Sequence, residues 1–288
     1  MTAQQMGRVL FWMAGTLLSF SAMAVSIRAL AGALSIFEIL AVRNGIGLTI
    51  LIAIVAVRPQ LRSDLVPRRM GLHLLRNAIH QSSQYAWALS ITLLPLATVF
   101  ALEFTMPAWT TVLAVALLGE RLTPSRAAAI VLGLLGVLVI LRPGLETFRP
   151  AALLVLAAAF GYASVNVATK KLTSTESTFA IIFWMNLMQL PMALLGSDLG
   201  FVARLDGMMI LPVIAIGVAG VASHYCLTNA FRAGDASVVV PIDFLRMPLI
   251  ALVGWLFYAE PFDPYVFLGA GLIVVGVLWN LNAELRGR

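Results

Sequence analysis

The chain has 288 residues, of which 61% are hydrophobic and only 11% are charged, and its mean hydropathy is +0.96. Soluble domains carry about 25% charged residues, so 19 basic and 13 acidic side chains are too few to cover a soluble fold of this length. This composition predicts an all-α integral membrane protein. The net charge of +6 does not indicate nucleic-acid binding, because the basic residues lie between apolar runs rather than on one face.

Apolar runs separated by polar residues, glycine and proline predict ten membrane-spanning helices of about 20 residues each. In chain order they cover residues 9–30, 36–57, 70–93, 96–118, 125–142, 150–170, 178–197, 208–231, 236–258 and 264–283. The first run has a signal peptide as its alternative, because Arg8 precedes it and Ala22-Met23-Ala24 resembles a cleavage site. Its length and its counterpart in the repeat described next favour a helix that stays in the protein.

Lys and Arg are distributed unequally between the two predicted sides of the membrane. Twelve lie in segments on the side of the N-terminus and four on the other side. This positive-inside bias predicts that both termini are cytoplasmic, in a multi-pass protein of the cell inner membrane. The remaining three basic residues fall within predicted helices: Arg43, Arg76 and Arg246.

The two halves of the chain resemble each other. A shift of about 140 residues superimposes several polar positions, which chance matching among apolar residues does not easily explain. These pairs include Tyr85 with Tyr225, Glu103 with Asp243, Glu120 with Glu260, and Asn44 with Asn186. The predicted repeats are 1–144 and 145–288. Because each holds five spans, an odd number, the second copy is expected to be inverted, as in carriers that expose a midplane site to alternate sides.

Five charged residues are predicted at membrane depth, where insertion costs at least about 2.5 kcal/mol without a partner or a water-filled cavity. They are Arg43, Arg76, Glu103, Asp243 and Arg246. Asp243 and Arg246 are three residues apart, so mutual neutralisation is the alternative to a functional role. For Glu103 proton coupling is the functional interpretation, and capping of an interrupted helix before Pro107 is the structural interpretation that we favour. The residues predicted for coupling or gating are Glu103, Asp243, Arg246, Arg43, Pro107 and Pro241.

Polar and aromatic residues in the third predicted helix point to a binding site. Arg76, His80, Gln84 and Trp87 are spaced by four, four and three residues, which puts them on one helix face. Donors and acceptors beside an aromatic ring suit a zwitterionic amino acid, whereas polar packing between helices is the alternative. The predicted substrate-binding residues are His80, Gln84, Tyr85, Trp87, Trp109, Tyr162, Asn166, Trp184 and Tyr225. Pro107 and Pro241 are expected to kink the interiors of two paired spans and are candidate hinges. The alternative is that they have no gating role, because proline is common in membrane helices generally.

Three motifs of the first half carry a family resemblance: Glu103-Phe104-Thr105-Met106-Pro107, Leu118-Gly119-Glu120-Arg121-Leu122-Thr123 and Leu141-Arg142-Pro143-Gly144. The second half has looser copies in Pro241-Ile242-Asp243-Phe244 and Glu260-Pro261-Phe262. The chain thereby resembles EamA-type members of the drug/metabolite transporter superfamily, and within it YddG-type amino-acid exporters. The resemblance implies ten helices, with helices one to four and six to nine around a central cavity and helices five and ten at the periphery.

These features predict a secondary transporter that exports small metabolites, aromatic or other neutral amino acids first, by alternating access. A carrier of another metabolite or drug, such as a vitamin or a nucleoside-like compound, is the alternative, followed by a passive channel. An enzyme is not expected, because H-E-x-x-H, G-x-S-x-G and paired cysteines are absent from the sequence. No cofactor and no metal are predicted. The expected partners are the lipid bilayer and the substrate but no nucleic acid, with the chain as a monomer or alternatively a dimer.

Overall fold

The computed structural model describes residues 2–94, 99, 102–103, 105–141, 151–246, 249, 252 and 264–286. Every regular element within these ranges is a helix, and they contain no strand. Four of the described helices are long and apolar enough to cross a membrane by length and composition: Gln4–Leu30, Ile36–Val57, Ala151–Leu172 and Gly207–Ala233. The prediction of an all-α membrane protein is confirmed at this level.

In the first half, α1 (Ala3–Leu30) begins six residues before the apolar run that predicted it. Thr2 accepts a hydrogen bond from the amide of Gln5, and the Gln5 side chain accepts one from the amide of Thr2, so a capping box extends the helix. A second capping box, between Ser35 and Glu38, starts α2. The elements are α1 (Ala3–Leu30), α2 (Ile36–Val57), η1 (Pro59–Leu65), α3 (Met70–Leu93), α5 (Met106–Leu118) and α6 (Pro124–Leu141).

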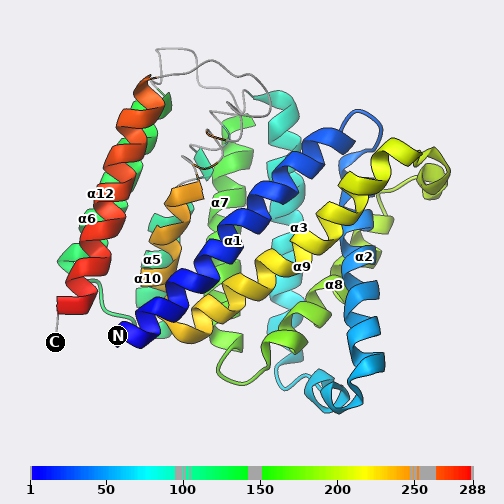
Figure 1. Cartoon of the computed structure of the whole chain (residues 1–288), viewed down its shortest axis with the longest axis horizontal. Coiled ribbons are helices and arrows are strands. Elements are labelled where there is room, and N and C mark those ends of the chain that lie inside the picture. Colours follow the sequence, from blue (N-terminus) through cyan, green and yellow to red (C-terminus); the bar gives the residue numbers. More distant parts are fainter. Residues whose placement is uncertain are drawn as a thin grey trace.

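In the second half, two short 3-10 helices lie in the connection between the second and third long helices. Its elements are α7 (Ala151–Leu172), α8 (Thr178–Leu194), η2 (Leu199–Arg204), η3 (Gly207–Met209), α9 (Ile210–Ala233), α10 (Ala236–Ile242), η4 (Asp243–Leu245) and α12 (Pro264–Arg286). The two ends of the chain lie at the same end of the bundle (Figure 1). Each predicted range contains a helix, but only parts of spans 96–118 and 236–258 are described, so ten spans stay a prediction.

Helix packing relates the two halves. α1 packs along α9 and α3 along α7, while α2 packs against α8 and α6 against α12. The first helix of each half thus packs on the third helix of the other half, and the second and fifth helices pack on their own counterparts. Exchanging the two halves leaves this set of pairs unchanged. α6 and α12 form a pair at one edge of the bundle (Figure 1). Their backbones approach closely, because a Cβ atom on Gly136 would lie 2.5 Å from the carbonyl oxygen of Gly269.

Two prolines mark interruptions near the centre of the bundle. Leu102 and Glu103 are helical, Thr105 forms a turn, and Pro107 then lies in the first turn of α5. Pro107 thus follows an interruption of the predicted span. Amides of a first turn have no intrahelical partner, so proline fits there without a lost bond, and its role as a hinge stays a prediction. Pro241 does lie inside α10, which ends at Ile242 and continues as η4.

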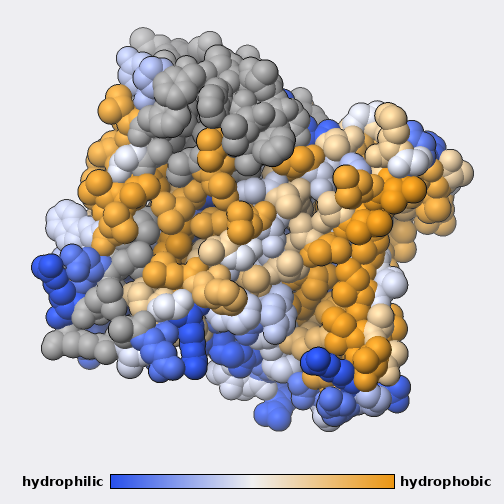
Figure 2. Space-filling view, in the orientation of Figure 1, coloured by the Kyte–Doolittle hydropathy of each residue, from blue (hydrophilic) through white to orange (hydrophobic). Residues whose placement is uncertain are grey.

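Apolar side chains cover much of the outer surface. In Figure 2 hydrophobic residues spread over the middle of the visible face, and hydrophilic residues gather along its lower edge, near the two chain ends. Phe11 of α1 is 68% exposed and Leu117 of α5 is 62% exposed. Such large apolar side chains on the outside of a helical bundle are stable in contact with lipid.

Candidate functional site

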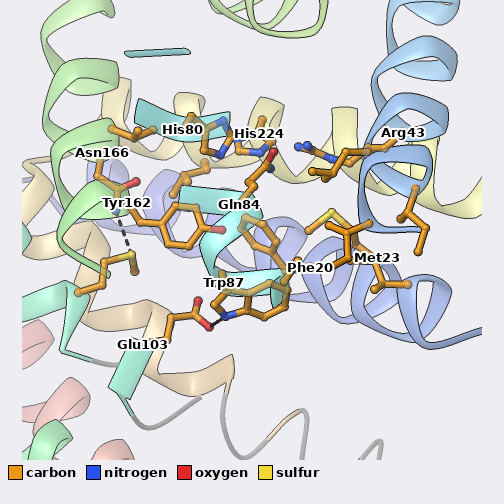
Figure 3. Close-up of a pocket in the computed structure, with 18 of the residues that line it drawn as sticks. Phe20, Met23, Arg43, His80, Gln84, Trp87, Glu103, Tyr162, Asn166 and His224 are labelled. Atoms are coloured by element: carbon orange, nitrogen blue, oxygen red, sulfur yellow. Dashed lines mark hydrogen bonds between the residues drawn. The ribbon is translucent and has the colours of Figure 1, made fainter. Parts of the chain in front are cut away.

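A cavity of about 440 Å³ lies inside the bundle. Its wall comes from α1, α2, α3, α7 and α9, together with Glu103, Met106, Asp243 and Arg246. None of the described side chains of the edge helices α6 and α12 lines it. Figure 3 shows aromatic, amide, imidazole and charged side chains converging on this space. The volume is within the roughly 300–1,000 Å³ that small-molecule sites occupy.

The polar face of α3 forms one side of the cavity. Arg76, His80, Gln84 and Trp87 all line it, in agreement with the shared helix face that their spacing predicted. The amide Nε2 of Gln189 lies 2.7 Å from Nδ1 of His80. Because an amide nitrogen can only donate, His80 accepts this bond at Nδ1. Oε1 of Gln84 is buried without a hydrogen-bond partner in the described part of the chain and is available to a ligand.

One end of the cavity holds a carboxylate cluster, defined here as Glu103, Asp243, Arg246 and Trp87. Nε1 of Trp87 donates to Oε2 of Glu103 at 2.6 Å, and Nη2 of Arg246 donates to Oε1 of Glu103 at 2.8 Å. The same Nη2 lies 3.1 Å from Oδ2 of Asp243. Asp243 therefore does not neutralise Arg246 alone. The cluster joins two carboxylates and one guanidinium, and it links residues of the two halves that are 143 positions apart.

These contacts also bear on the capping alternative for Glu103. α5 has no side-chain hydrogen bond at its N-cap, and the two carboxylate oxygens of Glu103 are bound by Trp87 and Arg246. The guanidinium carbon of Arg246 lies 5.3 Å from the centroid of the Phe20 ring, within the range of a cation–π contact. Glu103 is thus held by side chains that line the cavity rather than by the start of a helix.

The other end holds an arginine cluster, defined here as Arg43, Arg76, His80 and His224. Nε of Arg76 donates to Oγ1 of Thr169 at 2.7 Å and its Nη1 donates to Oδ1 of Asn77 at 3.0 Å, so its partners there are neutral. None of the three guanidinium nitrogens of Arg43 has a hydrogen-bond partner among the residues described. The rings of His80 and His224 meet edge to face, with centroids 5.0 Å apart.

The structure brings together most of the predicted site residues. His80, Gln84, Trp87, Tyr162 and Asn166 line the cavity, as do Arg43, Glu103, Asp243 and Arg246. Pro107 and Pro241 lie outside its lining.

Four predicted binding residues contact other parts of the bundle. Tyr85 is one position after Gln84, hence turned away from the cavity, and its ring lies 4.6 Å from that of Phe37. The other three contacts are Trp109 with Phe160 at 5.6 Å between ring centroids, Tyr225 with Trp12 at 5.8 Å, and Nε1 of Trp184 with the carbonyl of Leu65 at 3.0 Å.

Several lining residues were not predicted from the sequence. Phe20, Met23 and Ile27 of α1 line the cavity, as does Met106 at the start of α5. An apolar residue in a membrane helix gives the same sequence signal whether it faces lipid, a neighbouring helix or a cavity. His224 gave a clearer signal as a polar residue within an apolar run. Among the residues described, no group of three His, Cys, Asp or Glu side chains is placed to hold a metal ion.

A bundle with an apolar exterior and a charged internal cavity defines a class of protein, the membrane carriers of small molecules. The model of the EamA-like transporter family matches this chain twice, at residues 7–142 and 149–282. The chain belongs to the EamA-like transporter family. It is therefore a transporter rather than an enzyme, and the predicted superfamily membership is confirmed.

The chain is also similar to individual transporters and to a solved structure. The chain is 33% identical over 215 residues to a riboflavin transporter of Rhizobium johnstonii, covering 74% of this chain and 71% of that one. It is 25% identical over 225 residues to an S-adenosylmethionine uptake transporter of Rickettsia felis, with coverage of 78% and 76%. A solved crystal structure matches with a TM-score of 0.73 over 92% of this chain and 96% of that one, and at 21% identity it shows the fold alone.

The comparisons separate the coarse functional prediction from the fine one. A small-metabolite transporter of the EamA fold is confirmed. Amino-acid export gains no support, because the relatives carry the names of a vitamin and of S-adenosylmethionine. The alternative, a vitamin carrier, agrees better with them.

Proposed function

We propose that this chain transports a vitamin with a flat heteroaromatic ring, riboflavin first, across the inner membrane by alternating access. The observation that carries the proposal is the cavity itself, where rings of Phe20, Trp87 and Tyr162 stand beside the amides of Gln84 and Asn166. Aromatic walls suit a planar ring system. Buried amide groups suit ring carbonyls and a hydroxylated side chain, which are the polar groups of riboflavin.

S-adenosylmethionine is the second candidate, and the charges in the cavity rank it lower. Its sulfonium centre is a cation, whereas Arg43 and Arg76 form no ion pair within the described part of the chain. Like charges at short range in a buried site repel. The carboxylate cluster at the other end still offers a place for a cationic group, so competition by S-adenosylmethionine is a direct way to compare the two candidates.

The proposed mechanism rests on two inverted five-helix repeats, 1–144 and 145–288, with both termini cytoplasmic. The double match of the family model and the exchangeable helix pairs support this arrangement. In alternating access, contacts between the halves form at one end of the site while those at the other end break. The bond from Arg246 to Glu103 is one such contact. Other contacts join the halves elsewhere: Glu176 with the amides of Arg68 and Arg69, and Arg126 with Asp235.

Within this mechanism, substrate in the cavity would compete with the internal contacts of Glu103, Asp243 and Arg246. A proton taken up by Glu103 would remove its ionic bond to Arg246 and favour separation of the halves. The end of α10 at Ile242, directly after Pro241, offers a point at which Asp243 and Arg246 can move relative to the rest of the chain.

The test is transport of radiolabelled riboflavin by the purified chain in proteoliposomes. We expect saturable uptake that unlabelled riboflavin suppresses, and suppression by S-adenosylmethionine or tryptophan only at much higher concentrations. Trp87→Ala is expected to reduce the flux strongly, and the matched control Trp279→Ala, at an exposed site on α12, is expected to leave it unchanged. Saturable flux of tryptophan without any flux of riboflavin would overturn the vitamin assignment.

A further inference from the structure

Arg43 occupies an unusual position for a charged side chain. It is 1% exposed, it lies on the cavity wall, and Nε, Nη1 and Nη2 have no hydrogen-bond partner in the described ranges. Desolvation of a guanidinium is costly, and proteins normally offset this cost with a carboxylate or with several hydrogen bonds. Five donors that find no acceptor in the described part of the protein point to an acceptor from outside it.

The neighbours of Arg43 add to the excess of positive charge and of hydrogen-bond donors instead of offsetting it. Arg76, also 1% exposed, donates to Thr169 and Asn77, which carry no charge. Nε2 of His224 is buried without a partner among the described residues. In Figure 3 the guanidinium of Arg43 points toward His224, at the end of the cavity away from Glu103. This end is therefore rich in donors and positive charge, and the carboxylates of the cavity lie at its other end.

The fold also makes room for the Arg43 side chain. α9 passes this side chain at Gly220, where a Cβ atom would lie 2.8 Å from Nε and 2.9 Å from Cγ of Arg43. Any residue larger than glycine would have to displace the arginine. The close approach of the α9 backbone keeps the guanidinium at the cavity wall, which is the arrangement of a built site rather than of a side chain that happens to be buried.

We propose that Arg43, supported by Arg76 and His224, forms a subsite for an anionic group. A carboxylate or a phosphate would satisfy the fork of guanidinium donors in a bidentate manner and would offset the buried charge. Riboflavin itself carries no anionic group, so the group is either the phosphate of a transported flavin such as riboflavin 5′-phosphate or a free inorganic anion that binds beside the transported molecule. Only the first of these two sources rests on the proposed transport function.

The test uses the purified full-length chain and inorganic phosphate, with acetate as the carboxylate probe. Thermal unfolding is followed in a zwitterionic buffer as each anion is added. We expect a saturable rise in Tm for the wild type, and an apparent affinity roughly tenfold lower or worse for Arg43→Gln. The matched control is Arg62→Gln, at an exposed arginine of η1, which is expected to respond as the wild type does. An equal rise in Arg43→Gln, or no saturable rise in the wild type, overturns the proposal.

Stability without added anion supplies an independent readout. If Arg43 awaits a ligand, then Arg43→Gln removes an uncompensated buried charge and is at least as stable as the wild type. Arg43→Lys, which keeps the charge but loses the planar fork, is expected to bind phosphate weakly but measurably. A folded Arg43→Gln protein with a clearly lower Tm than the wild type would show that Arg43 serves the packing of the bundle, and this outcome contradicts the subsite.

Flavin binding separates the two sources of the anion. If the transported molecule carries it, riboflavin 5′-phosphate binds at least about tenfold more tightly than riboflavin, and the advantage disappears in Arg43→Gln. If the anion is free, added phosphate strengthens the binding of riboflavin itself. Phosphate stabilisation without riboflavin transport would overturn the vitamin assignment and leave the subsite standing, whereas riboflavin transport without any effect of anions would overturn the subsite alone.

Discussion

The two ends of the cavity solve the problem of buried charge in different ways. In the carboxylate cluster, Arg246 binds Glu103 and Asp243, and Trp87 donates to the remaining Glu103 oxygen. In the arginine cluster, Arg43 has no such partner among the residues described. A charge that the protein itself satisfies fixes how the halves meet. A charge that it leaves unsatisfied provides affinity for something that enters the cavity.

The largest effect on stability is expected from a substitution that breaks the carboxylate cluster. Arg246→Gln leaves Glu103 and Asp243 buried next to each other without a cation. Removal of one partner from a buried ionic cluster costs about 3–5 kcal/mol. We therefore expect a large fall in the free energy of unfolding, measured by chemical denaturation in detergent.

The double variant Glu103→Gln/Arg246→Gln serves as the control for Arg246→Gln. It removes one negative charge along with the positive one, so it is expected to recover part of the lost stability. If Arg246→Gln alone unfolds with wild-type stability, the two carboxylates gain nothing from the guanidinium, and the contrast between the two ends of the cavity is lost.

Glu103→Gln tests whether the carboxylate cluster also takes part in transport. Its amide oxygen can still accept the bond from Trp87, and Arg246 keeps Asp243, so the fold is expected to persist. The ionic bond across the halves is lost, and a charged hydrogen bond is worth about 1.5–3 kcal/mol, which predicts a change in flux of about tenfold or more. The measurement is riboflavin flux at several pH values. Wild-type flux from Glu103→Gln at every pH would exclude a proton-coupling role.

The sequence predicted the helices well, because the backbone groups of a segment in lipid must form their hydrogen bonds within that segment. A long apolar run therefore forms a helix. The early start of α1 was missed, since the capping box of Thr2 and Gln5 lies outside the apolar run. Charges at membrane depth were found in the same way. The spacing of three residues also predicted the contact between Asp243 and Arg246. It did not predict the bond between Glu103 and Arg246, because these residues are far apart in the chain and only tertiary packing brings them together.

The aromatic residues were harder to place than the charges. Tyr85 and Trp109 have the residue types of a binding site, yet a ring in a membrane helix is stable against lipid, a neighbouring helix or a ligand. Phe20 and Met23, which do line the cavity, have no sequence feature that distinguishes them from lipid-facing residues. Residue type therefore identifies candidate residues, and the helix face that each occupies decides between them.

A smaller effect, on anion binding, is expected when the arginine cluster is disturbed without removal of its charge. Gly220→Ala places a Cβ atom 2.8 Å from Nε and 2.9 Å from Cγ of Arg43, so the arginine side chain must shift. We expect phosphate affinity to fall several-fold while the Tm without anion changes little. The matched control is Gly271→Ala in α12, where an added Cβ meets nothing within 4 Å. If both variants bind phosphate as the wild type does, the position of Arg43 is not what determines binding.

The smallest effects are expected from two tyrosines that differ in place but not in chemistry. Tyr162 lines the cavity, whereas Tyr225 packs on Trp12 and is 43% exposed. Tyr162→Phe removes a hydroxyl group from the cavity wall and is expected to weaken riboflavin binding by a few-fold, at a cost of about 0.5–1.5 kcal/mol. Tyr225→Phe is expected to change the binding constant by less than the error of a fluorescence titration. Equal losses from both substitutions would mean that the substrate reaches Tyr225. The binding site would then extend beyond the cavity, along α9 to its contact with α1.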